Sequence, residues 1–366
     1  MEKVEARIIG VISLFAFLLG GLFLAALPLQ AADDNAKVIK LVSSLPRTGS
    51  SNKQTTDVVR GIKMAMEEAG SRAGDFELRY EDWDDASPQT GKWEATVEQS
   101  NATRAVNDPD VMVYLGTYNS GAAKISIPIL NQAGLLMISP ANTWPGLTKP
   151  GTGAPNEPAV YRPTGKINFC RVVPADDLQG PMGALLAKKL KATKVFILHD
   201  RELYGKGIAD LFQVKAKELG IAVVGFEGID SQAANYKSLA TKIRSTGADL
   251  IYFGGVTDSN AGQLTKDIRS AGVKCPLLVP DGCFEDAFIQ SAGASNLNGT
   301  TYATFGGAPA SEWQGKGKEF LARFQEKYGK DSLPEPYSIY GYECAKVAIE
   351  AIRKADKKDR AAILQA

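Results

Sequence analysis

One run of small polar residues in this sequence could bind an anion. The apolar run Val111–Gly116 is followed by Thr117-Tyr118-Asn119-Ser120-Gly121-Ala122 and then by a stretch with helical character. This order predicts that Ser120 is a helix N-cap, where free backbone N–H groups and partial positive charge favour a carboxylate. A serine at this position also caps helices that bind nothing, so the residues alone leave both interpretations open.

Two further polar segments follow apolar runs. Ser139-Pro140-Ala141-Asn142-Thr143-Trp144 ends one run, and Asp281 follows the run Leu277–Pro280. If the runs are parallel strands, these segments lie at the carboxyl edge of a sheet, where open α/β sheets bind ligands. A carboxylate at Asp281 could receive an ammonium group, although a single loop aspartate more often forms a turn.

Patterns for catalysis are scarce. His199 is the only histidine, and the sequence contains no GxSxG, HExxH or Walker pattern. Because His199 and Asp200 end an apolar run, a secreted hydrolase that uses them is a remote alternative, but no nucleophile motif accompanies them. We therefore expect no catalytic residue, no cofactor and no metal ion.

The elements that position these residues alternate between apolar runs and amphipathic stretches. Helices are predicted at Thr55–Ala69, 312–328 and 338–354. Strands are predicted at Val38–Val42, Phe76–Trp83, Val111–Gly116, Leu135–Ser139, Lys194–His199, Ile221–Phe226, Leu250–Gly254 and Leu277–Pro280. Apolar strands that alternate with helices indicate an α/β fold with parallel sheets covered on both faces.

The chain of 366 residues is about twice as long as an ordinary domain. One sheet with all the predicted strands would be unusually wide, so we expect two α/β lobes. The segments Phe169–Val173 and Thr301–Phe305 are expected to cross between an N-terminal lobe, residues 37–171 plus 305–366, and a C-terminal lobe, residues 172–304. The Pro- and Gly-rich segment 144–168 is interpreted as a surface loop.

The first residues are typical of an export signal. Lys3 and Arg7 precede an apolar run over residues 8–27, and small residues follow before Asp33. This pattern predicts a signal peptide, residues 1–32, that is cleaved from a periplasmic or extracellular protein. An uncleaved membrane anchor is the alternative.

Charge and cysteine content narrow the choice of partners. Lys and Arg total 42 and Asp and Glu total 41, which gives a net charge of +1. The sequence therefore lacks the excess of basic residues that nucleic-acid binding requires. Export would permit disulfides, but the cysteines fit neither a CxxC nor a zinc motif. Buried free thiols are therefore expected at Cys170, Cys275, Cys283 and Cys344.

Six short motifs occur in order along the chain. The strongest are Gly134–Pro140 (GLLMISP), Asp176–Gly180 (DDLQG) and Leu198–Gly207 (LHDRELYGKG), and weaker ones are Pro46–Gly49, Gly254-Gly255 and Pro280–Gly282. Together they resemble the periplasmic branched-chain amino acid binding proteins over about residues 37–355. The resemblance implies the type I fold of this family, with two doubly wound parallel-sheet lobes joined by a hinge. It also implies that the chain serves an ABC importer and closes on an amino acid.

The resemblance implies roles for individual residues. Ser120 matches a serine at a helix start that binds the ligand carboxylate, and Ala141 matches a position that contributes its backbone. Thr143 matches a residue whose backbone N–H and hydroxyl serve the carboxylate and the amine. Tyr204 and Asp281 match second-lobe groups that engage the amine, although many relatives carry Glu at the latter position. The implied partners are the amino acid and the membrane permease of the ABC transporter, and we expect a monomer.

Departures from the family pattern concern the side chain of the ligand. Gln54 stands where an aromatic residue is common, and Val256 stands where branched-chain binders carry a tyrosine. Tyr118, Asn119 and Trp144 flank the matched residues and could line this part of the pocket. A branched-chain or related amino acid is therefore expected, with a binding protein or sensor for an amide, urea or aromatic acid as the alternative. The family's C-terminal tail has no counterpart here, so the chain is interpreted as truncated at that end.

Overall fold

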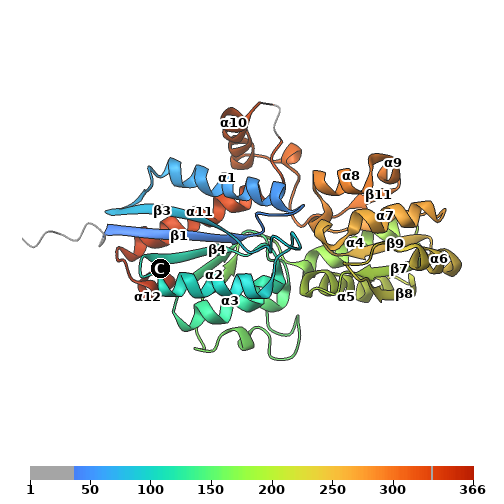
Figure 1. The fold of residues 1–366 in the computed structure, drawn as a ribbon, viewed down its shortest axis with the longest axis horizontal. Coiled ribbons are helices and arrows are strands. Elements are labelled where there is room, and N and C mark those ends of the chain that lie inside the picture. The colour runs from blue at the N-terminus through green and yellow to red at the C-terminus, as the bar shows by residue number, and fades with distance from the viewer. Residues whose placement is uncertain (1–36, 331–332) are drawn as a thin grey trace, which may run out of the picture. The chain divides into compact units, whose positions relative to one another are not determined.

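The computed structural model describes residues 37–330 and 333–366. The predicted signal peptide, residues 1–32, lies outside the described residues. The described chain contains two sheets, each with helices on both faces (Figure 1). We call the first sheet with helices α1–α3 and α10–α12 the first lobe, and the second sheet with helices α4–α9 the second lobe.

The first sheet has the strand order β2-β3-β1-β4-β5-β6 and is parallel except for the pair β2–β3. Its strands are β1 (Val38–Leu45), β2 (Arg72–Ala73), β3 (Phe76–Asp84), β4 (Val111–Gly116), β5 (Leu136–Ser139) and β6 (Phe169–Arg171). Its helices are α1 (Asn52–Glu68), α2 (Ala95–Asn107), α3 (Ser120–Gln132), α10 (Lys316–Tyr328), α11 (Ser338–Ala355) and α12 (Arg360–Gln365).

Both faces of the first sheet are covered because its strands are apolar at successive positions. Neighbouring residues of a strand point to opposite faces. Leu41 and Val113 accordingly pack in the cluster formed with α1, α10 and α11, whereas Val42 and Tyr114 pack in the cluster formed with α2 and α3. The continuous apolar runs of the sequence are thus explained by burial on both sides.

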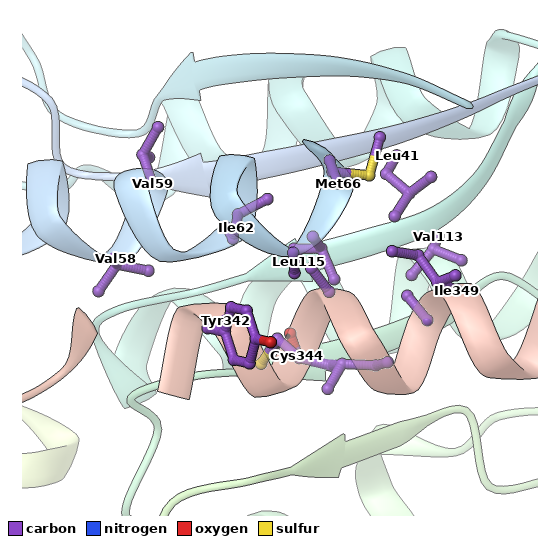
Figure 2. Close-up of a cluster of buried hydrophobic side chains, with 14 of the residues drawn as sticks. Leu41, Val58, Val59, Ile62, Met66, Val113, Leu115, Tyr342, Cys344 and Ile349 are labelled. Carbon is purple, nitrogen blue, oxygen red and sulfur yellow. Dashed lines mark hydrogen bonds between the residues drawn. The ribbon is translucent and has the colours of Figure 1, made fainter. Parts of the chain in front are cut away.

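Two glycines allow α11, near the end of the chain, to pack closely on α1. A Cβ atom on Gly61 would lie 2.1 Å from the carbonyl oxygen of Ser338, and one on Gly341 would lie 2.2 Å from that of Val58. Only glycine permits such an approach. Figure 2 shows the resulting core, in which side chains of α1, of strands β1 and β4 and of α11 lie together.

The second sheet has the strand order β11-β10-β9-β7-β8, and all its pairs are parallel. Its strands are β7 (Lys194–His199), β8 (Ala222–Gly228), β9 (Leu250–Gly254), β10 (Leu277–Val279) and β11 (Thr301–Ala303). One face packs against α4 (Asp176–Lys189) and α5 (Leu203–Glu218). The other face packs against α6 (Lys237–Thr246), α7 (Ala261–Ser270) and α8 (Asp286–Ala292), and the short α9 (Ala294–Leu297) follows.

The expected fold class is confirmed, since all the predicted strands form and every pair between them is parallel. The helix predicted from residue 312 begins only at Lys316, because residues 310–312 form a short 3-10 turn and Gly315 has a φ of +52°. The segment 144–168 is a loop, but it is not entirely on the surface: Trp144, Leu147 and Tyr161 are buried against α3.

Candidate functional site

A small cavity lies where the carboxyl ends of the two sheets meet. The residues that line it follow β4, β5, β7, β9 and β10, apart from one that precedes α11. These residues are Tyr118, Asn119, Ser120, Ala141, Thr143, Tyr204, Val256, Asp281, Gly282 and Tyr337. The topology therefore brings together loops from both lobes at the edge where parallel sheets bind ligands.

Most of the residues singled out from the sequence line this cavity, but Gln54 and Trp144 do not. Gln54 is fully buried and accepts a hydrogen bond from the hydroxyl of Tyr118. The Trp144 indole points elsewhere, because its Nε1 donates to Glu157 at 3.0 Å. Neither side chain therefore lines the cavity as the structure has it, and their place in the pocket stays a prediction.

Sequence reasoning missed two lining residues, Gly282 and Tyr337. Gly282 belongs to the motif Pro280–Gly282 and could have been found from its neighbour Asp281. Tyr337 carried no such signal, because it follows a loop and belongs to none of the motifs. Its ring reaches the cavity only because α11 packs on the first sheet.

Ser120 lies at the start of α3, but it is not the N-cap. Asn119 occupies that position in an extended conformation, and no side chain caps the helix. The Ser120 hydroxyl oxygen instead accepts the backbone N–H of Trp144 at 3.3 Å. The N–H groups in the first turn of a helix have no partner within the helix, so this end of the cavity offers donors and partial positive charge.

Two buried polar side chains hold the loops after β4 and β5 together. The Ser139 hydroxyl donates to the carbonyl of Thr117 at 2.9 Å and accepts the N–H of Asn142 at 2.8 Å. The Asn142 amide nitrogen donates to the carbonyl of Tyr118 at 3.0 Å. These bonds fix the position of Ser120 relative to Thr143 without help from a ligand.

The second lobe places an acid at the opposite end of the cavity. Asp281 is 2% exposed and accepts hydrogen bonds from the hydroxyls of Tyr204 and Tyr337 and from the Gln179 amide at 3.1 Å. Burial raises the pKa of Asp281, and these hydrogen bonds oppose the rise. The cavity thus has donors at one end and an acid at the other.

A second acid lies close to Asp281. Asp176 begins α4, is fully buried, and donates its backbone N–H to the carbonyl of Thr143 at 2.9 Å. Burial raises the pKa of Asp176 strongly, and the charge of Asp281 raises it further. The proximity of the two carboxyl groups disfavours the state in which both are ionised.

His199 and Asp200 are buried but do not line the cavity. The Nδ1 of His199 accepts the backbone N–H of Arg201 at 3.1 Å, and its ring lies 5.2 Å from that of Phe226. Asp200 accepts the hydroxyl of Ser259 at 2.8 Å. The hydrolase alternative depends on this pair lying at the edge of the pocket, and neither residue lines the cavity.

The lobes also contact each other outside the cavity. Asp258, after β9, accepts the backbone N–H of Ser50 at 3.1 Å and the hydroxyls of Ser50 and Ser51. Trp144 packs against α5, since a Cβ atom on Gly207 would lie 2.3 Å from its ring. Closure of the lobes therefore involves contacts that no pocket residue makes.

Other features limit what the described residues can do. Within residues 37–330 and 333–366, no cluster of three or more His, Cys, Asp or Glu side chains is arranged to hold a metal ion. None of the helices in these ranges is both long and apolar enough to cross a bilayer.

All four cysteines are free. Cys283 and Cys344 are buried as expected, whereas Cys275 is half-buried and Cys170 is exposed, contrary to expectation.

The chain belongs to the periplasmic binding protein family, whose model matches residues 38–366. Membership in this family implies a solute-binding protein that works outside the cytoplasm. The family is not a class of enzymes. An amino acid binding protein of Pseudomonas aeruginosa is 27% identical over 320 residues, which cover 86% of this chain and 78% of that protein. A Leu/Ile/Val-binding protein homolog of Brucella abortus is 28% identical over 344 residues, covering 93% and 84%.

The fold agrees with a solved relative. The crystal structure of a leucine binding protein, LivK, from Thermotoga maritima superposes with a TM-score of 0.77 at 25% sequence identity. The match covers 89% of this chain and 86% of that one.

Proposed function

We propose that this chain is the solute-binding component of an ABC importer and captures an α-amino acid between its two lobes. The observation that carries this proposal is the polarity of the cavity, with the start of α3 at one end and Asp281 at the other. A zwitterion has the complementary arrangement of charge. The relatives described above as binding amino acids, leucine, or Leu, Ile and Val support the same class of ligand.

In the proposed complex the ligand carboxylate binds to the first lobe. The free N–H groups at the start of α3 and the Ser120 hydroxyl donate to it, and the backbone N–H of Thr143 adds another donor. The ammonium binds to Asp281, with Tyr204, the Thr143 hydroxyl and the carbonyl of Ala141 as further acceptors. An ammonium has three donors and no acceptor, so an end made of acceptors suits it.

The side chain of the ligand would occupy the space beside Tyr118, Asn119 and Val256. A branched-chain or related side chain is proposed because two relatives carry such names. Val256 is smaller than the tyrosine typical of branched-chain binders, so the preference among such ligands is expected to differ from theirs.

Ligand binding would shift the protein toward the closed arrangement of its lobes. The proposed lobes are residues 37–171 plus 305–366 and residues 172–304. A ligand that contacts both lobes binds the closed form more tightly than the open form and so raises its population. We propose that the exported protein, freed of residues 1–32, acts as a monomer and passes its ligand to a membrane permease.

Titration calorimetry of residues 33–366 tests this function. The protein is first unfolded and refolded to remove any copurifying solute, and then titrated with a panel of amino acids, an amide, urea and an aromatic acid. We expect heat from at least one amino acid, with a smaller radius of gyration by X-ray scattering after it binds. Binding of only the amide, urea or aromatic acid would contradict the proposal, as would no binding by any member of the panel.

A further inference from the structure

The hydrogen bonds to the Asp281 carboxylate leave one lone pair of its Oδ2 without a donor. Its Oδ1 accepts from the Tyr204 hydroxyl, from the Gln179 amide at 3.1 Å and from the Gly282 N–H at 3.0 Å. Its Oδ2 accepts from the Tyr337 hydroxyl, the one protein donor that reaches it within the described ranges. Because a carboxylate oxygen has two lone pairs, Oδ2 can accept one more hydrogen bond.

Tyr337 provides a second unused acceptor beside Asp281. Its hydroxyl proton is donated to Asp281, and within the described chain no donor reaches its oxygen. The side chain is 2% exposed and lines the cavity. Edge contacts hold its ring, with centroids 6.1 Å from that of Tyr118 and 5.4 Å from that of Phe305. The phenolic oxygen is therefore fixed at the cavity wall with a free lone pair.

Tyr337 and Asp281 come from different lobes. Tyr337 immediately precedes α11 of the first lobe, and Asp281 follows β10 of the second. Their hydrogen bond can exist only while the lobes are together. A ligand group that touches both oxygens therefore stabilises the closed arrangement through the same pair of residues.

We propose that Tyr337 determines specificity for a primary amine, because it accepts one N–H of the ligand while it donates to Asp281. This inference rests on the proposed function and extends it to the chemistry of the amine. One ammonium proton serves Asp281 Oδ2 and a second serves the Tyr337 oxygen. The third is shared by the acceptors named above, which are Tyr204, the Thr143 hydroxyl and the carbonyl of Ala141. An N,N-dimethyl amine keeps a single N–H, which the carboxylate takes, since hydrogen bonds between charged groups are stronger.

Titration calorimetry with matched variants tests this role. The probes are the amino acid that binds most tightly in the panel above and its N,N-dimethyl derivative. Tyr337→Phe removes one hydroxyl and keeps the ring. Tyr340→Phe is the control, because Tyr340 also packs against Phe305 but does not line the cavity.

We expect Tyr337→Phe to weaken binding of the primary amine about 10- to 100-fold, the loss of one hydrogen bond to a charged group. Binding of the dimethyl derivative should change by less than about threefold, because its single N–H does not use Tyr337. Tyr340→Phe should leave both affinities within about twofold. A thermal unfolding midpoint of the ligand-free variant near that of wild type verifies the fold.

Three results would overturn the inference while leaving the proposed function intact. The first is an equal loss of affinity for both probes in Tyr337→Phe, which would mean that the hydroxyl only favours closure of the lobes. The second is a loss in Tyr340→Phe as large as that in Tyr337→Phe. The third is equal affinity of the wild type for both probes, which requires no variant. If the wild type bound no amino acid at all, the proposed function itself would be wrong.

Discussion

The end of the cavity at the start of α3 presents backbone donors, whereas the end at Asp281 presents side-chain acceptors from both lobes. Ser120 and Thr143 lie in loops that Ser139 and Asn142 hold together, and each loop directly follows a strand of one sheet. Asp281 instead receives hydrogen bonds from Gln179, Tyr204 and Tyr337, which belong to separate elements.

This difference in construction has consequences for substitution. Backbone N–H groups at a helix start remain when a side chain is truncated, so the donor end should tolerate single changes. The acceptor end depends on one carboxylate, and its removal leaves a buried cation without a partner. The following predictions test this asymmetry, from the largest expected effect to the smallest.

Asp281→Ala should weaken amino acid binding by about 2 to 5 kcal/mol, because the ammonium would be buried without its counter-charge. Titration calorimetry measures the change. Asp210→Ala is the control: Asp210 is an acid on α5 whose ion pair with Lys206 is exposed, and its loss should change affinity by less than about 0.5 kcal/mol. Unchanged affinity in Asp281→Ala would mean that the amine binds elsewhere.

Gly207→Ala should weaken binding by about 1 to 3 kcal/mol without touching either end of the cavity. The new methyl group would meet the Trp144 ring, which its bond to Glu157 holds in place, so the lobes could not close fully. Thermal unfolding of the ligand-free protein is the control, and because alanine favours helices its midpoint should not fall. A lower midpoint together with unchanged affinity would show that the contact stabilises the fold and not closure.

Affinity should fall as the pH is lowered, by at most about tenfold per pH unit for a single carboxyl group. The sign follows from Asp281: burial raises its pKa, and below that pKa the protonated acid no longer attracts the ammonium, which stays charged. The donor end contains no group that titrates in this way. The pH dependence of the dissociation constant should disappear in Asp281→Asn.

Ser120→Ala should cost about 1 kcal/mol of binding free energy, the value of one hydroxyl hydrogen bond. The N–H groups at the start of α3 would still bind the carboxylate. Ser126→Ala, a buried serine further along the same helix, is the control and should leave affinity unchanged. If Ser120→Ala lost as much affinity as Asp281→Ala, the two ends of the cavity would not differ as described.

The sequence predicted the elements and the edge of the sheet at which the cavity lies. Continuous apolar strands followed by helices are local patterns, and parallel sheets place their strand ends at a common edge. Ser120, the segment 139–144 and Asp281 could be singled out for this reason, since each follows a strand. The resemblance to a known family then singled out Ala141 and Thr143 within that segment and added Tyr204.

The neighbours of these residues were decided by tertiary packing. Tyr337 reaches Asp281 because α11 packs on α1 through Gly61 and Gly341, a contact between distant parts of the chain that no local pattern encodes. The directions of the Gln54 and Trp144 side chains were likewise set by their partners Tyr118 and Glu157. Periodicity determines which face of an element is buried, but the hydrogen bond that a buried polar side chain makes depends on which elements meet there.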